Sequence, residues 1–300
     1  MKIAFYHQGS GYGGTDHQAT LLHGALRKIG HEVVAFTEPT DLSRFNAVVI
    51  VHLNNIRTPK FYQSCKLYKK PYVVKTIWFP WKPGLFTYDV CRDASFLFAE
   101  SPRERQILAS VFPNIEHKTE VTLPAVDSIF TNKGKPAKDR PLVHVNGRYI
   151  KHKRALDVLR VCKDLKLPVC VSGFPQDQEY YRACMGVGYG EVLTEKDKPA
   201  LCDILNESRL YVCASDMEVC SASVSEAIAC GCNVLASEVY HPGNSNFTEE
   251  GYFLYDGTNL HEAMEKAYYS DAVQRNGFWT PEMLAEAYSN AFSKMVPKLL

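Results

Sequence analysis

The sequence has no long hydrophobic run, no low-complexity tract and no C-x-x-C pair. Nowhere do about 18 apolar residues follow one another, and the apolar run at the start is too short for a secretory signal. We therefore expect no transmembrane segment and a protein that is cytoplasmic, or peripheral to the membrane. Ten cysteines are scattered inside apolar stretches, which indicates reduced core residues rather than a metal or redox site.

The composition is that of a globular protein large enough for two domains. Of its 300 residues, 46% are hydrophobic and 22% charged, which argues against disorder, collagen and coiled coil. Short, nearly continuous apolar runs alternate with helical patterns, as in parallel sheets buried on both faces. The fold class predicted is α/β, with two Rossmann-like doubly wound domains facing a cleft where ligands bind.

The predicted domain boundaries follow from a stretch rich in Lys, Pro and Gly at 131–141, TNKGKPAKDRP, which is typical of a linker. The first domain is expected over 1–135 and the second over 141–280. A last amphipathic helix over 281–300, with apolar positions 284, 288, 292 and 296 on one stripe, is expected to pack back on the first domain.

Charge is distributed unevenly along the chain. Residues 1–140 contain 19 Lys and Arg against 12 Asp and Glu, a net charge of +7, whereas residues 141–300 carry −6. The first domain is therefore expected to face something anionic, unless the asymmetry is only an accident of surface composition.

A glycine-rich loop follows the first predicted strand. Gly9, Gly11 and Gly14 match G-x-G-x-x-G, whose backbone amides can bind a phosphate at the start of a helix. The acidic residue expected after a second strand would be Glu38, which lies 24 residues beyond Gly14 rather than about 20. The loop fits either a dinucleotide site or a tight turn that needs glycine.

Cationic residues cluster after the first strand of the second domain, in the segment Gly147-Arg148-Tyr-Ile-Lys-His-Lys153-Arg154. The planar guanidinium of Arg148 and the point charge of Lys153 together suit a diphosphate. Positive charges at the start of a helix oppose its dipole, so they are unfavourable for stability alone. This cost favours a role in ligand binding over a mere run of solvent-exposed charges.

Two glutamates lie eight residues apart around a predicted strand-to-helix turn. Ser223-x-x-Glu226 matches a capping box, so Glu226 has a purely structural interpretation. Glu218 has none, and a carboxylate at the end of a strand is placed to bind hydroxyl groups. The amides of residues 219–221 could bind phosphate oxygens.

Taken together, these segments resemble the retaining glycosyltransferases of family 4, the glycosyltransferase group 1 enzymes, which have the GT-B fold. The resemblance runs nearly end to end. It is carried by Gly13-Gly14, Gly30-His31-Glu32-Val33, FLFAES with Ser101, Leu123-Pro124-Ala-Val126-Asp127 with Phe130, Gly147-Arg148 with Lys153, and Glu218-x7-Glu226 running into EAIACGCNVLAS.

The resemblance implies transfer of a sugar from a nucleoside diphosphate sugar, here a UDP-sugar, with retention of the anomeric configuration. It would make Arg148 and Lys153 the ligands of the leaving diphosphate and Glu218 the ligand of the sugar hydroxyls, and these three would be the catalytic residues. Donor binding would also involve Gly13, Gly14, Val219, Cys220, Ser221 and Glu226, the last at the ribose. No metal or other cofactor is implied, and the chain lacks an Asp-x-Asp motif.

The chain departs from the family pattern at three points. Glycines usual one and three residues after the first glutamate are replaced by Val219 and Ser221. A histidine usual after the fourth strand is either replaced by Trp78 or shifted along the chain. The chain is also shorter than is typical, which indicates trimmed acceptor loops. These differences leave the identity of the donor sugar open.

The acceptor predicted is anionic, either a membrane lipid headgroup or a phosphorylated envelope saccharide. A basic first domain favours it, and so do clustered lysines and aromatic residues. The same features suit DNA with hydroxymethylated bases, the acceptor of some phage members. The alternatives outside this class are an NAD-dependent oxidoreductase and an inactive nucleotide-sugar-binding protein. The clustered lysines and aromatic residues of the first domain are Lys66, Lys69, Lys70, Tyr62, Tyr68, Tyr72, Trp78 and Trp81.

Overall fold

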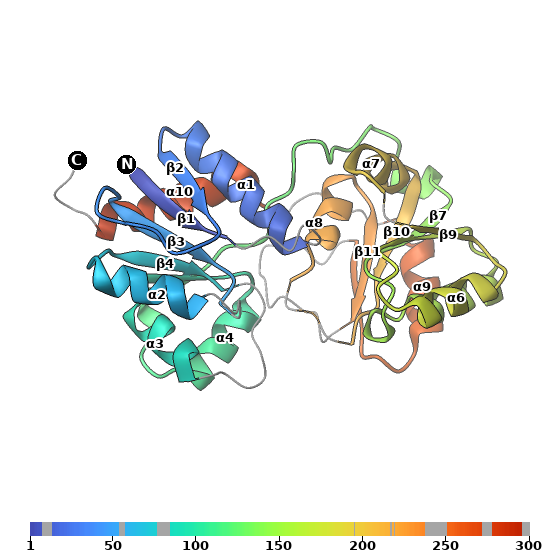
Figure 1. Cartoon of the computed structure of the whole chain (residues 1–300). Helices are drawn as coiled ribbons and strands as arrows, with labels where there is room; N and C mark the ends of the chain where they lie inside the picture. The colour runs from blue at the N-terminus through green and yellow to red at the C-terminus, as the bar shows by residue number, and fades with distance from the viewer. Residues whose placement is uncertain are drawn as a thin grey trace. The chain divides into compact units, whose positions relative to one another are not determined.

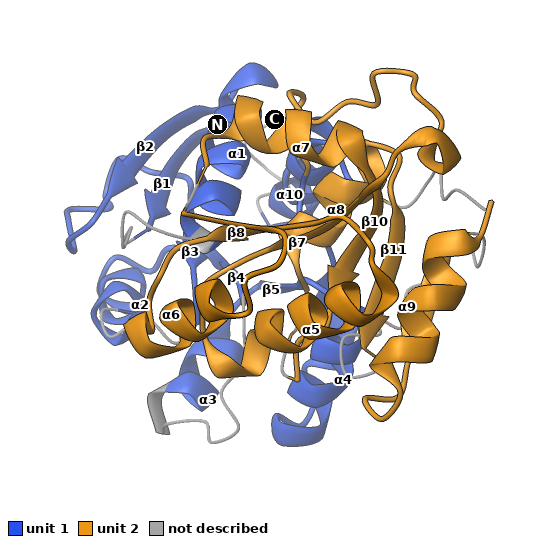
Figure 2. Cartoon of the chain, turned by 90° about the vertical axis from the view of Figure 1, so that its right-hand side faces the viewer, with its two compact units in different colours: residues 1–125, 279–300 blue, residues 126–278 orange. Residues whose placement is uncertain are grey.

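The computed structural model divides the chain into two compact units (Figure 2). Unit 1 comprises 1–125 and 279–300, and unit 2 comprises 126–278. Each contains a six-stranded parallel sheet, which confirms the predicted α/β class. The structure describes residues 1–7, 14–53, 58–76, 85–194, 196–216, 218, 220–237, 251–271 and 278–295.

Unit 1 has the strand order β2-β1-β3-β4-β5-β6, with all neighbours parallel. Its central strands are entirely buried, as expected of apolar runs such as AVVIV. The elements are β1 (Lys2–Tyr6), α1 (Gly14–Lys28), β2 (Glu32–Phe36), β3 (Ala47–Val51), α2 (Thr58–Leu67), β4 (Tyr72–Lys75), α3 (Leu85–Asp93), β5 (Phe96–Ala99), α4 (Pro102–Val111), η1 (Glu116–Lys118), β6 (Thr119–Val121) and α10 (Pro281–Met295).

The two faces of this sheet carry different helices (Figure 1). Ile3 and Phe5 of β1 pack with α1 and α10, whereas Ala4 and Tyr6 pack with α2, α3 and α4. This alternation is the period-2 pattern of a strand buried on both sides. Ser101 begins α4 as predicted, because its Oγ accepts a hydrogen bond from the Glu104 amide.

The last helix belongs to unit 1 although it follows unit 2 in the chain. α10 lies beside α1, and its residues Leu284, Tyr288 and Phe292 are fully buried. The Tyr288 ring stacks on Phe98 with centroids 3.9 Å apart. Position 296, the fourth of the predicted stripe, lies outside the described residues.

Unit 2 has the strand order β12-β11-β10-β7-β8-β9, again all parallel. One face of the sheet packs against α5, α6 and α9, and the other against α7 and α8. Its elements are η2 (Ala137–Asp139), β7 (Leu142–Asn146), η3 (Lys151–Lys153), α5 (Ala155–Leu165), β8 (Val169–Gly173), α6 (Gln178–Gly186), β9 (Glu191–Thr194), α7 (Lys198–Glu207), β10 (Ser208–Cys213), α8 (Ala222–Ala229), β11 (Asn233–Ser237), β12 (Tyr252–Tyr255) and α9 (Leu260–Tyr269).

The predicted linker at 131–141 is wrong, and the boundary after 135 lies ten residues too late. Phe130 is buried in the core of unit 2, and Arg140 is 1% exposed. The Arg140 guanidinium donates hydrogen bonds of 2.8 Å to the carbonyls of Lys135 and Cys230. Lysine, proline and glycine made this segment resemble a linker, but the buried guanidinium ties it to unit 2.

All ten cysteines lie within the described residues and none forms a disulfide. Nine are buried, and Cys220 is half-buried. Burial raises the pKa of the Cys65 thiol to about 12, which keeps that thiol protonated and unreactive. None of the described helices is both long and apolar enough to span a bilayer.

We predict that Gly173→Ala destabilises the fold severely. A Cβ at Gly173 would lie 1.6 Å from the Gly147 carbonyl oxygen, and φ there is +156°. Gly24 in α1 has open space around it, so the control Gly24→Ala should instead stabilise the protein by up to about 1 kcal/mol. Thermal unfolding followed by circular dichroism measures both, and equal melting temperatures would contradict the prediction.

Candidate active site

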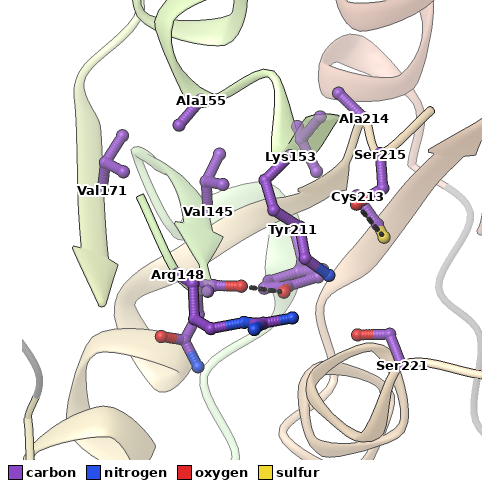
Figure 3. Close-up of a pocket in the computed structure, with 13 residues that line it drawn as sticks. Val145, Arg148, Lys153, Ala155, Val171, Tyr211, Cys213, Ala214, Ser215 and Ser221 are labelled. Atoms are coloured by element: carbon purple, nitrogen blue, oxygen red, sulfur yellow. Dashed lines mark hydrogen bonds between the residues drawn. The ribbon is translucent and has the colours of Figure 1, made fainter. Parts of the chain in front are cut away.

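A pocket lies in unit 2 where the carboxyl ends of β7 and β10 meet (Figure 3). β8 and β9 continue the sheet on one side of β7, while β10 lies on its other side, so the direction of the strand order reverses here. Parallel α/β sheets bind their ligands at such a switch point. The lining includes Gly147, Arg148, Lys153, Tyr211, Ser215 and Ser221.

The loop after β7 is held in place by its backbone. Gly147 donates its amide to Ser172 at 3.0 Å, and Tyr149 donates to Phe174 at 2.9 Å. These bonds fasten the loop to the end of β8. The turn η3 then ends at Arg154, whose φ is +55° and whose guanidinium lies 2.9 Å from Asp157. Lys153 therefore projects from a fixed turn into the pocket.

Two of the three predicted catalytic residues, Arg148 and Lys153, line this pocket, and the third, Glu218, contacts Lys153. The Lys153 ammonium donates a hydrogen bond to the Glu218 carboxylate. Both side chains are mostly buried, with 18% of Lys153 and 16% of Glu218 exposed. Arg148 is exposed, and its Nη1 donates to Gln176 at 3.0 Å. A phosphate ligand would thus meet one mostly buried and one exposed cation.

A chain of hydroxyl groups joins the central strand β10 to the start of α8. The Tyr211 hydroxyl donates to Ser223 Oγ at 2.8 Å, and Ser223 Oγ lies 2.7 Å from Ser221 Oγ. Ser221 is the N-cap residue of α8, so the capping box predicted from Ser223 and Glu226 is not formed. Sequence reasoning missed Tyr211, because its hydroxyl reaches this site only through the fold.

Glu226 is buried inside α8 rather than at its start. Its side chain is 8% exposed, and no described residue donates a hydrogen bond to its carboxylate. Burial raises the pKa of Glu226 to about 7, Asp127 adds to the rise, and Lys198 opposes it. Lys198 donates to Asp127 at 2.8 Å, so both belong to the surroundings of Glu226.

Only some of the other predicted donor-binding residues lie in the part of the chain that the structure describes. Gly14 is the first residue of α1, and Cys220 is half-buried between β10 and α8. Gly9, Gly11, Gly13, Val219 and Trp78 lie outside the described residues.

Comparison with known proteins identifies the family. A model of the group 1 glycosyl transferases matches residues 127–276, which is half of the chain. This protein belongs to the group 1 glycosyltransferases. It is therefore a glycosyltransferase, and the oxidoreductase alternative raised by the glycine loop is wrong.

Solved structures show that the glycosyltransferase has the GT-B fold. Sucrose-phosphate synthase from Thermosynechococcus elongatus is similar with a TM-score of 0.73 at 15% identity, covering 99% of this chain and 97% of that one. Anabaena HepE in complex with UDP-glucose gives 0.71 at 13% identity, covering 98% and 95%. The starch synthase IV catalytic domain from Arabidopsis thaliana, bound to ADP and acarbose, gives 0.71 at 13%, covering 99% of each chain. No curated protein matches the sequence.

We predict that Glu226→Gln stabilises the glycosyltransferase at pH 8 but much less at pH 5. The pKa of the Glu226 carboxyl is about 7 in the folded protein, against an ordinary value of 4.5. The stability that comes from protonating this carboxyl in the folded state is therefore lost as the pH rises from 4.5 through 7. Relative to wild type, the free energy of unfolding of the variant should rise by about 2 kcal/mol between pH 5 and pH 8.

Urea unfolding at several pH values measures this difference. Glu265→Gln, at an exposed position of α9, is the control and should follow the wild-type profile. A difference between Glu226→Gln and wild type that is the same at pH 5 and pH 8 would show that burial does not penalise the ionised carboxylate.

Proposed function

We propose that this glycosyltransferase transfers a sugar from a UDP-sugar to an anionic acceptor with retention of the anomeric configuration. The observation that carries the proposal is the contact between Lys153 and Glu218 at a pocket that Arg148 also lines. One cation and one carboxylate placed together can hold the two halves of a nucleotide sugar, its diphosphate and its sugar hydroxyls.

Arg148 and Lys153 stabilise the charge that grows on the diphosphate as the bond from the anomeric carbon to the phosphate oxygen breaks. The acceptor oxygen forms the new bond to that carbon, and its proton goes to the departing phosphate. The two side chains supply the positive charge, so we propose that no metal is required.

The remaining donor contacts follow the family resemblance. Glu226 binds the ribose hydroxyls, and the amides of Val219, Cys220 and Ser221 bind phosphate oxygens at the start of α8. Gly13 and Gly14 also contribute, the latter as the first residue of α1. UDP is proposed as the nucleotide because HepE, a protein of the same fold, was solved with UDP and with UDP-glucose.

The proposed acceptor is a membrane lipid headgroup or an envelope saccharide that carries negative charge. Unit 1, as the structure delimits it, contains 17 Lys and Arg against 12 Asp and Glu. It is therefore positively charged, as predicted for the first domain. The proposed aromatic surface needs correction, because Tyr62 and Tyr72 are buried in the core of unit 1. Tyr68 is half-buried against the same core, and Trp78 and Trp81 lie outside the described residues. The lysines therefore remain as the main support.

The free thiols suit a reducing compartment, and we place the enzyme in the cytoplasm, at the membrane surface when it meets a lipid acceptor. Glycosylation of hydroxymethylated bases in DNA is the second candidate, because the same positive charge attracts a polyphosphate.

We predict that Lys153→Ala weakens UDP-glucose binding by roughly 10- to 100-fold, since a charge-assisted hydrogen bond contributes about 1.5–3 kcal/mol. Glu218→Ala should instead lower the rate of UDP release by about 100-fold, with a smaller change in affinity. Calorimetry and a UDP-release assay, run with and without EDTA over a panel of nucleotide sugars, separate the two effects.

Lys151→Ala is the matched control, since Lys151 is exposed in the same turn and does not line the pocket. Binding and release that are unchanged in both Lys153→Ala and Glu218→Ala would refute the site.

The anomer of the sugar released first, read by NMR before mutarotation, should match that of the donor. Binding without any release would favour the inactive alternative.

We predict that the protein binds vesicles containing anionic lipid and that this binding weakens as salt is raised. Duplex DNA titrated under the same salt series is the comparison. Binding to neutral vesicles of equal strength would contradict an electrostatic contact. Binding to DNA alone would favour the nucleic-acid acceptor.

A further inference from the structure

The sheet of unit 1 has a switch point of its own, between β1 and β3 (Figure 1). β2 lies on one side of β1, and β3 to β6 continue on the other. His7 directly follows β1, His52 directly follows β3, and Asp16 lies in the first turn of α1. Ligands of parallel α/β sheets bind at this position, as the proposed donor does in unit 2.

His7 and Asp16 form a close pair. Nε2 of His7 lies 2.9 Å from Oδ1 of Asp16, and only 15% and 19% of their side chains are exposed. A carboxylate beside Nε2 favours the tautomer with the proton on that nitrogen, which leaves Nδ1 as a hydrogen-bond acceptor. Nδ1 is buried and has no partner among the described residues, and Nε2 makes its close contact with Asp16 without hydrogen-bond geometry.

His52 occupies an unusual backbone conformation. Its φ is +77°, in the left-handed region that side chains other than glycine rarely adopt. The conformation is held by hydrogen bonds of 2.9 Å from its amide to the Lys75 carbonyl and from Thr58 Oγ1 to its own carbonyl. Its Nδ1 is also buried without a partner among the described residues. Strain and an unsatisfied buried nitrogen both cost stability and point to a ligand.

Burial lowers the pKa of both imidazoles below the ordinary value. Asp16 opposes this effect on each ring, and His7 adds to it on His52. Both rings are therefore neutral at pH 7, when each offers one donor and one acceptor. A hydroxyl group, which also donates and accepts, matches such a pair, whereas the charge of Asp16 repels an anion.

Three nitrogens of the two imidazoles are open in this sense, because both ring nitrogens of His7 and Nδ1 of His52 are buried without a hydrogen-bond partner among the described residues. Buried polar atoms of this kind cost stability unless a ligand or water supplies the hydrogen bond.

We propose that His7, Asp16 and His52 form a binding site for a saccharide hydroxyl group of the acceptor, with Nδ1 of His7 accepting the hydrogen bond of that hydroxyl. This proposal rests on the sugar-transfer function proposed above and names the group that accepts the sugar. Asp16 acts as a positioning residue, because it orients His7 and sets its tautomer. The negative charge of the acceptor is then bound elsewhere on unit 1.

The test is NMR of the full chain with histidine rings labelled at 13Cε1 and 15N. Without ligand, the nitrogen shifts of His7 should show a protonated Nε2 and a bare Nδ1. Addition of methyl α-glucoside, methyl β-galactoside or methyl α-mannoside should shift the His7 and His52 signals saturably with at least one of them. A protonated Nδ1 on His7, or no response to any of the three, overturns the proposal.

Two variants separate binding from folding. Asp16→Asn should mix the His7 tautomers and weaken the glycoside response at least tenfold. His52→Asn should weaken it as much and leave the melting temperature equal or higher, because asparagine tolerates the left-handed conformation. A lower melting temperature with an unchanged response would show that His52 is only structural. His261→Gln, at an exposed position of α9, is the control.

UDP binding measured on the same samples distinguishes this proposal from the proposed function. If UDP binds but the glycosides do not affect His7, the acceptor site fails alone. If the glycosides shift His7 and His52 while UDP and UDP-sugars do not bind, the donor assignment fails and the hydroxyl site stands.

Discussion

The proposed donor site of unit 2 depends on the close approach of two glycine backbones. The chain leaves β7 at Gly147 and passes so near Gly173, at the end of β8, that a side chain has no room there. Hydrogen bonds between the two loops hold this approach, and the turn that carries Lys153 begins from it. A parallel sheet aligns the carboxyl ends of its strands, so the β7 loop and the β10 loop open into the same space. Lys153 and Glu218 meet there although 65 residues separate them.

Two polar residues at the proposed sites of this enzyme are held at a cost in stability. Glu226 is held in an environment that penalises its ionised form, and His52 in a backbone conformation that costs free energy. Neither arrangement stabilises the fold, and both become favourable once a ligand supplies hydrogen bonds. Arg140 shows the opposite case, because carbonyl groups of its own unit satisfy its guanidinium.

The two units divide the charges of the reaction. Unit 2 is acidic overall and yet places Arg148 and Lys153 at the point where a diphosphate would leave. Unit 1 is basic overall and yet places Asp16 and two imidazoles at its own switch point. In each unit the local charge at the site is opposite to the net charge. This is consistent with net charge guiding the approach of a ligand and local charge selecting its reacting group.

The sequence alone determined the fold class and most of the strands, because short continuous apolar runs such as AVVIV that alternate with helical patterns are typical of a parallel sheet buried on both faces. It also indicated Arg148, Lys153 and Glu218, whose residue types have no structural use at the end of a strand. Tertiary structure decided the rest. The buried guanidinium of Arg140 moved the domain boundary, and Ser221 rather than Ser223 became the N-cap of α8. The contact between His7 and Asp16 depends on how α1 packs beside β1, and His52 lies near them because β3 is the neighbour of β1 in the sheet. Local propensity carries no information about that order, since it is set by long-range packing of the sheet.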